Sequence, residues 1–233
     1  MDRHTKAIVG LAWARELGLA DDAFQRDRSQ RVTRVDGSMV MYLSLWQYRI
    51  LIGPAEVLAA ARRLGDDQLS SGPALLALSG HSPAGHGRLM GEAVLGFTDC
   101  YVQDGQLEQA TVTDDPEAVN DLEKSCPPDD VAEVNLSAMA WSCATLDELD
   151  QIRSGAGFDE WQGILAQMGV LTPPARRREG HGLTVAGIAT NEALDRGLVP
   201  QWRARTGNRG SRRIAQRLGY ARAGRQVTVV LDS

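Results

Sequence analysis

One stretch near the C-terminal end constrains the fold of this chain more than any other. An apolar run over residues 164–171 stops at Pro173-Pro174, and an Arg-rich loop with two glycines follows. A segment with helical periodicity then covers residues 183–194. The free amides and the dipole at a helix start attract anions, and glycines let the backbone approach a ligand closely. The sequence therefore predicts a strand, a tight loop and a helix that form an anion site.

The rest of the C-terminal half continues this alternation of strands and helices. Strands are expected over residues 139–146, 152–161, 198–204 and 226–231, and helices over residues 116–125 and 211–218. We expect an α+β fold, in which helices cover both faces of a central mixed sheet.

The N-terminal half predicts a smaller α+β lobe. Residues 5–17 and 88–95 are expected to be helical. Asp36-Gly37 lies between two β-rich runs and predicts a hairpin, and a third strand covers residues 48–52. This half has no phosphate loop. It is either a degenerate half-copy of the other lobe or a lobe for substrate binding or dimerisation. We place one boundary near residue 105, which separates lobes 1–105 and 106–233.

Composition indicates the cellular compartment in which the protein is expected. No apolar run reaches the roughly 18 residues of a membrane span, and the first residues lack the apolar core of a signal peptide. Cys100, Cys126 and Cys143 are odd in number and far apart, which argues against a disulfide framework and for a reducing compartment. We expect a cytoplasmic protein with three buried thiols and no membrane partner.

Charge is distributed unevenly. Residues 174–225 hold 12 Arg against 3 acids, a balance of +9, so the rest of this chain of net charge −5 carries −14. These arginines either form a solvated surface or line a pocket for a polyanionic cofactor. An acidic chain with a pI near 5.4 and no recognised motif argues against a nucleic-acid partner. His81 and His86 lack a third ligand nearby, and we expect no metal.

Two motifs together resemble those of the GNAT acyltransferases. The loop Arg177-x-x-Gly180-x-Gly182 matches their pyrophosphate pattern, (Gln or Arg)-x-x-Gly-x-(Gly or Ala). Thirty-one residues after Arg177, a second motif begins at Asn208, continues through Ser211 and ends in Leu-Gly-Tyr, as their second signature does. The resemblance covers residues 110–233. It is closest to bacterial small-molecule N-acetyltransferases with an additional N-terminal half.

The resemblance implies acetyl-CoA as the co-substrate. In this family the fourth strand, here residues 164–171, splays from the fifth, and its exposed backbone binds the pantetheine arm like an added strand. The amide of Val170 is then the expected oxyanion donor. The donor contacts implied are Val170, Leu171, Thr172, Arg177, Arg178, Gly180, His181, Gly182, Thr184, Asn208 and Ser211.

The catalytic groups are less well defined by the resemblance. Several relatives carry a Glu base where this chain has Ala166-Gln167, and many carry a Tyr acid where it has Ala215. Glu160, on the preceding strand, is our candidate base, and a solvated surface carboxylate is the alternative. Ser211 or a water molecule is the candidate partner of the leaving thiolate.

The remaining expectations concern the aromatic residues near the site and the molecule that accepts the acyl group. Trp161 and Trp202 either form an aromatic wall for the substrate or pack in the core, whereas Tyr220 is expected in the core. The resemblance implies direct transfer of an acetyl group from acetyl-CoA to the primary amine of a small molecule. The alternative is a non-catalytic acyl-CoA-binding or interaction module. A homodimer is compatible with either function.

Overall fold

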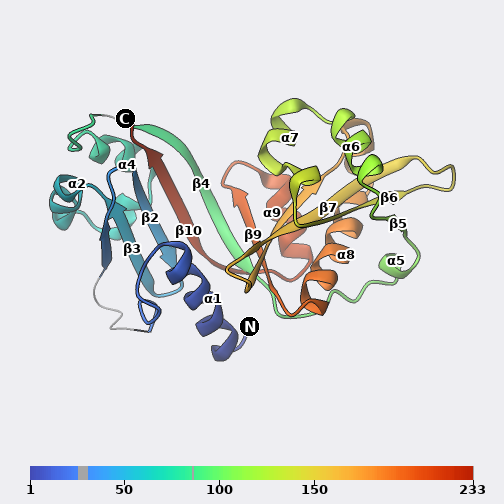
Figure 1. The fold of residues 1–233 in the computed structure, drawn as a ribbon, viewed down its shortest axis with the longest axis horizontal. Helices are drawn as coiled ribbons and strands as arrows, with labels where there is room; N and C mark the ends of the chain where they lie inside the picture. Colours follow the sequence, from blue (N-terminus) through green and yellow to red (C-terminus); the bar gives the residue numbers. More distant parts are fainter. Residues whose placement is uncertain (26–30, 86, 233) are drawn as a thin grey trace. The chain divides into compact units, whose positions relative to one another are not determined.

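The computed structural model describes residues 1–25, 31–85 and 87–232. The chain folds as two compact units (Figure 1). Unit 1 comprises residues 1–12, 97–202 and 210–221, and unit 2 comprises residues 13–96, 203–209 and 222–233. This division differs from a single cut near residue 105. The last strand, β10 (Ala221–Val230), pairs with β2 (Met39–Leu45) and so lies largely in unit 2.

Unit 1 contains the predicted strand, loop and helix. Its strands follow the order β9-β8-β7-β6-β5, and they are antiparallel except for the parallel pair β8 and β9. The strands are β5 (Thr111–Thr113), β6 (Trp141–Leu146), β7 (Ile152–Trp161), β8 (Leu165–Leu171) and β9 (Val199–Arg205). The helices are α5 (Gly105–Glu108), α6 (Pro116–Lys124), α7 (Pro128–Val134), α8 (His181–Asp195) and α9 (Arg209–Arg217), with short turns η2 (Leu136–Ala138) and η3 (Pro174–Arg176).

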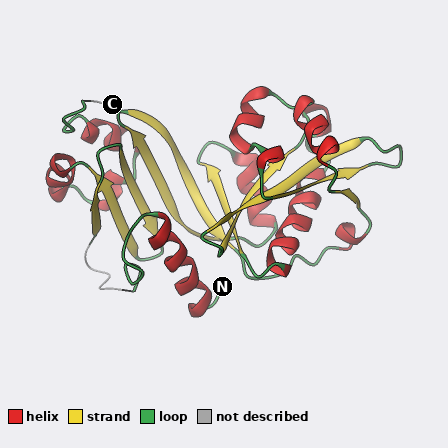
Figure 2. Ribbon diagram, in the orientation of Figure 1, coloured by secondary structure: helices red, strands yellow, loops and turns green. Residues whose placement is uncertain are grey.

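Helices cover both faces of the unit 1 sheet (Figure 2). On one face, Leu122 of α6 packs with Leu136 and with Leu171 of β8. On the other face, a Cβ on Gly182 of α8 would lie 3.8 Å from Val170 Cγ1. Successive side chains of a strand point to opposite faces. Odd-numbered residues of β8 therefore face α6 and α7, and even-numbered residues face α8.

Unit 2 is built on a second set of strands. Their order is β1-β3-β2-β10-β4. The elements are β1 (Val32–Val35), β2, β3 (Tyr48–Gly53), α2 (Ala55–Ala60), η1 (Ala61–Arg63), α3 (Asp66–Leu69), α4 (Gly72–Ser79), β4 (Arg88–Phe97) and β10. The end of helix α1 (Arg3–Glu16) also belongs to unit 2, whereas its residues 3–12, the last residue of β4 and the first of β10 lie in unit 1. The core of unit 2 joins Tyr42 and Val227 of the sheet to Val57 of α2 and Leu75 of α4.

The predicted hairpin at Asp36-Gly37 is wrong. Strand β1 pairs in parallel with β3, and β3 pairs with β2. A two-residue hairpin of the Asn-Gly or Asp-Gly kind needs positive φ at both central residues, which neither Asp36 nor Gly37 has. The Asp36 carboxylate instead accepts hydrogen bonds from the amide and hydroxyl of Ser38, which form a local turn. The hairpin lies between β2 and β3, where Trp46 has a φ of 49°.

Two further expectations in this region are corrected. Residues 88–95 form strand β4 rather than a helix, because pairing within the sheet overrides the helical propensity of Arg, Leu, Met, Glu and Ala. Cys100 is exposed, whereas Cys126 and Cys143 are buried as expected. Burial raises the pKa of the Cys143 thiol to about 12.

Candidate functional site

Strand β8 has an open edge in its second half. Its parallel ladder with β9 covers three residue pairs and ends at Gln167 and Gln201, although β8 continues to Leu171. Within the described chain, residues 168–171 have no paired strand on that side. The Val199 amide donates to the Ile164 carbonyl at 2.9 Å, and backbone direction alternates along a strand. The backbone groups of Val170 therefore point toward the same open side, which we call the fork.

The loop after β8 presents free amides. Gly180 is the N-cap of α8 with a φ of 96°, a left-handed conformation that favours glycine. Its carbonyl accepts the amides of Leu183 and Thr184 at 2.8 and 3.2 Å. Among the described residues, no acceptor meets the amides of Gly180, His181 or Gly182. A left-handed residue followed by a helix turns successive N–H groups toward one concavity, which is a geometry that binds anions.

Arg177 anchors the loop to the protein. Its Nε donates to the Thr172 carbonyl at 3.0 Å, and its Nη2 lies 2.6 Å from Asp130 Oδ2 of α7. The Arg177 guanidinium therefore binds other parts of the protein and holds the loop in place. Arg178, by contrast, is exposed and forms no ion pair with the described residues. Arg178 is the cation of this loop that remains available for a phosphate.

Gly182 sits where β8, α8 and α9 meet. A Cβ at this position would lie 2.9 Å from Thr172 Oγ1 and 3.6 Å from Ile214 Cδ1. The absence of a side chain thus allows the start of α8 to approach the end of β8. Thr172 and Thr184 are partly exposed beside this contact, and the side chain of Leu171 is buried in the core.

His181, the first residue of α8, contacts the loop through its ring. Its Nε2 lies 3.0 Å from Glu179 Oε2, and the side chain is 18% exposed against 49% for Glu179. The ring is thus held against the loop, and the backbone amide of His181 remains available for a ligand.

Ser211, which is partly buried, belongs to a chain of contacts that leads into the core. The indole of Trp202 donates to Ser211 Oγ at 2.9 Å, and the Trp202 and Tyr220 rings meet edge to face at 5.2 Å. The Tyr220 hydroxyl lies 2.9 Å from Thr190 Oγ1. Trp202 is only 5% exposed, which favours core packing over an aromatic wall. Tyr220 is buried as predicted, and burial raises its pKa, which is unsuitable for a catalytic acid.

Asn208 is the one predicted donor contact that lies in unit 2. It follows β9, and its backbone amide donates to the backbone carbonyl of Arg205 at 2.9 Å.

The candidate base Glu160 is far from Val170 along the sheet. Val170 pairs with Ala156 of β7, and Glu160 lies four residues further on, about 13 Å at the usual rise per residue. Glu160 is also exposed, and it shares the face of Ala156, which is the α8 face. Trp161 is partly buried at the end of the same strand.

Asp159, which the sequence analysis did not consider, lies one residue nearer to the pair of Val170, about 10 Å along β7. It pairs with Gln167, the last residue before the fork, and shares the face of α6 and α7. Its Oδ1 accepts the Ala140 amide at 3.1 Å, which orients the carboxylate. Only the register between β7 and β8 distinguishes these adjacent carboxylates, and sequence periodicity does not supply it.

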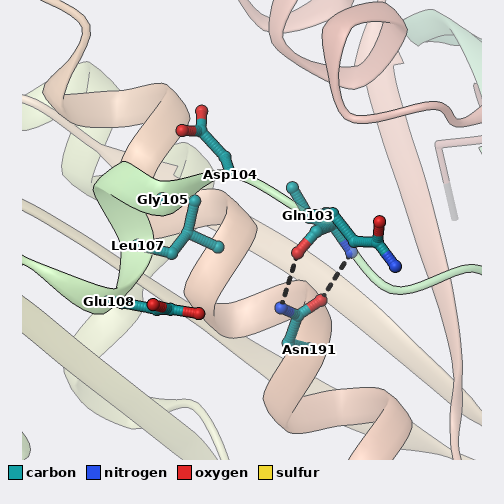
Figure 3. A pocket seen from close by; sticks show the side chains of 7 residues that line it. Gln103, Asp104, Gly105, Leu107, Glu108 and Asn191 are labelled. Atoms are coloured by element: carbon teal, nitrogen blue, oxygen red, sulfur yellow. Dashed lines mark hydrogen bonds between the residues drawn. The ribbon is translucent and has the colours of Figure 1, made fainter.

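A separate hollow of about 580 Å³ lies between residues 102–108 and α8 (Figure 3). The Asn191 carboxamide bonds both the amide and the carbonyl of Val102, at 2.8 and 3.1 Å. Asp104 and Glu108 are among the residues that line it. None of the predicted site residues lines this hollow.

Two features are absent from the described residues. No helix in them is both long and apolar enough to cross a membrane. No group of three His, Cys, Asp or Glu side chains in the same residues could hold a metal ion, and His86 lies outside them.

Comparison with known proteins places the fold. No protein-family model and no curated protein matches the chain. A GNAT-family protein from Novosphingobium aromaticivorans, described as an acetyltransferase, is 14% identical with a TM-score of 0.50, over 64% of this chain and 67% of its own. A GCN5-related N-acetyltransferase from Kribbella flavida is 20% identical with a TM-score of 0.48, over 64% and 61%.

A tandem GNAT protein from the clavulanic acid biosynthesis pathway is 13% identical with a TM-score of 0.46, over 95% and 69%. The chain thus spans about two thirds of the length of these three structures. The likeness to the Novosphingobium protein establishes the fold. The chain has the α+β GNAT fold, a mixed sheet flanked by helices, as the sequence predicted.

Proposed function

We propose that unit 1 binds an acyl-CoA, with acetyl-CoA as the expected donor, and transfers its acyl group to a small-molecule amine. One observation carries the proposal. The open edge of β8 runs directly into a loop whose amides have no acceptor among the described residues. An extended pantetheine arm can add to such an edge as a strand, while the loop amides bind its pyrophosphate.

The proposed reaction needs no covalent enzyme intermediate. The amine nitrogen attacks the thioester carbonyl, a C–N bond forms, and the C–S bond breaks to release CoA. The Val170 amide, which points into the fork, stabilises the oxyanion. A carboxylate of β7 takes the ammonium proton, and Asp159 is favoured over Glu160 by its register opposite Gln167. Ser211 or a water molecule returns a proton to the thiolate.

A titration with acetyl-CoA tests the binding step. At a hundred times its Kd, the donor should stabilise the fold by about 2.7 kcal/mol, which thermal shift or calorimetry detects. Acetyl-CoA and longer acyl-CoAs that leave the unfolding transition unchanged would overturn the proposal.

A second function, a non-catalytic acyl-CoA-binding module, is favoured by one observation. The candidate base Glu160 is exposed and about 13 Å along the sheet from Val170. Release of free CoA in the presence of a panel of primary amines separates the two functions. Binding without release for every amine supports the module, whereas amine-dependent release supports the transferase.

A further inference from the structure

Two glutamines meet at the point where the sheet forks. Gln201 Nε2 donates to Gln167 Oε1 at 2.8 Å, and Gln167 Nε2 donates to the Met168 carbonyl at 3.3 Å. Gln201 is fully buried, and Gln167 is partly buried. These two residues are also the last pair of the parallel ladder between β8 and β9.

The hydrogen bond from the Gln167 side chain to the Met168 carbonyl lies directly after the last residue pair of the ladder between β8 and β9. The Ile164 carbonyl accepts the Val199 amide, so alternation along β8 directs the Met168 carbonyl to the same side. In a continuing ladder, that carbonyl would accept an amide of β9. Here it accepts a side-chain amide instead. The next backbone groups that point to this side belong to Val170.

A glutamine pair is an unusual choice for this position. Parallel strands with both faces covered are normally near-continuous apolar runs, and a buried amide is costly unless its hydrogen bonds are satisfied. The pair therefore needs a local reason, and ending the ladder is the one that its contacts support.

We propose that the Gln167–Gln201 pair is a staple that stops β8 and β9 from zipping further and so keeps the Val170 edge open for the donor. The inference rests on the proposed function for its ligand, but the open edge itself can be tested without one. Both glutamines are positioning residues, because they act through the backbone of Met168 and Val170.

The test compares single and double leucine variants. Gln167→Leu or Gln201→Leu alone leaves a polar partner unsatisfied and should lower the melting temperature. Replacing both partners by apolar groups of similar size can be nearly neutral. The double variant should therefore lose less stability than the two single variants combined, yet bind acetyl-CoA at least tenfold more weakly, which calorimetry measures. Gln106→Leu, on the exposed surface of α5, is the matched control and should change neither quantity.

Hydrogen exchange without ligand supplies the independent readout. The Val170 amide should exchange rapidly in the wild type and become protected in the double variant as the ladder extends. A double variant with wild-type acetyl-CoA affinity and unchanged Val170 exchange would overturn the staple. A wild type that binds no acyl-CoA but shows the change in exchange would overturn the proposed function and leave the staple standing.

Discussion

Helix α8 of unit 1 and helix α4 of unit 2 start in opposite ways. In unit 1, β8 leads through a loop to α8, whose first amides have no acceptor among the described residues. In unit 2, β3 leads through Pro54 straight into α2, with Glu56 in its first turn. The first residue of α4, Gly72, donates its amide to Glu92 Oε1 at 2.6 Å. Unit 2 thus satisfies a helix start with its own carboxylate, whereas unit 1 leaves one open.

This difference between the helix starts determines where an anion can bind. A helix start is a general anion site, but an internal carboxylate occupies it as effectively as an external phosphate. Glu92 and Glu56 also place negative charge where a phosphate would have to come. Of the starts of α2, α4 and α8, only that of α8 is suited to the phosphates of a donor.

The largest effect expected in unit 1 concerns the base. Asp159→Asn keeps the shape and the acceptor for the Ala140 amide but removes the proton acceptor, and it should lower kcat about a hundredfold. The acetyl-CoA Kd should stay near normal. Glu160→Gln is the adjacent control and should retain most activity.

A comparison of kcat for the two variants decides between these carboxylates. If Glu160→Gln alone shows the hundredfold loss, the original assignment of Glu160 as base is correct. If neither does, the amine loses its proton to water before it binds.

The next largest effect tests the open helix start itself. Gly180→Val places a β-branched residue at a φ of 96°, where L-residues are strained, so the loop should change conformation. Acetyl-CoA binding should weaken at least tenfold, about 1.4 kcal/mol, in a folded protein. Calorimetry measures the change.

Gly197→Val is the matched control for that strain. Gly197 has a φ of 75°, and a Cβ there, as at Gly180, would meet nothing within 4 Å. It follows the other end of α8. It should cost similar stability without loss of donor affinity. Equal losses of affinity in both variants would mean that strain anywhere in unit 1 weakens binding and that the loop is not the phosphate site.

A smaller effect is expected in unit 2. Glu92→Gln replaces a charged acceptor at the start of α4 with a neutral one and should lower the free energy of unfolding by about 1 kcal/mol. The acetyl-CoA Kd should not change, because the donor binds unit 1. A Kd that shifts with Glu92 would break the separation between the two helix starts.

The sequence predicted the parts of this molecule that depend on local patterns. The order of β8, the loop and α8 was accessible because prolines, glycines and apolar periodicity are read over a few residues. Strand β4 was missed because its residues favour a helix until neighbouring strands pair with them.

Parts of the site were inaccessible for a different reason. Asp159 and Glu160 are adjacent in sequence, and only the strand register decides which one faces α6 and α7 beside Gln167. The bond between Gln167 and Gln201 joins residues 34 positions apart. No local signal in the sequence marks either contact.

The smallest effect concerns how the open helix start is held. Arg177 bridges the loop to Asp130 of α7, with both side chains nearly half exposed, at 45% and 43%. Exposed ion pairs are worth about 0.2–1 kcal/mol, so Asp130→Asn should cost the loop about 0.5 kcal/mol and weaken acetyl-CoA binding two- to threefold. Salt should reduce the difference, because an exposed pair is screened.

A double-mutant cycle isolates that contribution. Arg177→Ala also removes the bond to the Thr172 carbonyl and should weaken binding more than Asp130→Asn does. In the Arg177→Ala background, Asp130→Asn should have no further effect, because its partner is gone. Losses that add across the cycle would show that Asp130 supports binding by a route other than Arg177. A direct effect of its charge on the phosphates would instead make Asp130→Asn strengthen binding in both backgrounds.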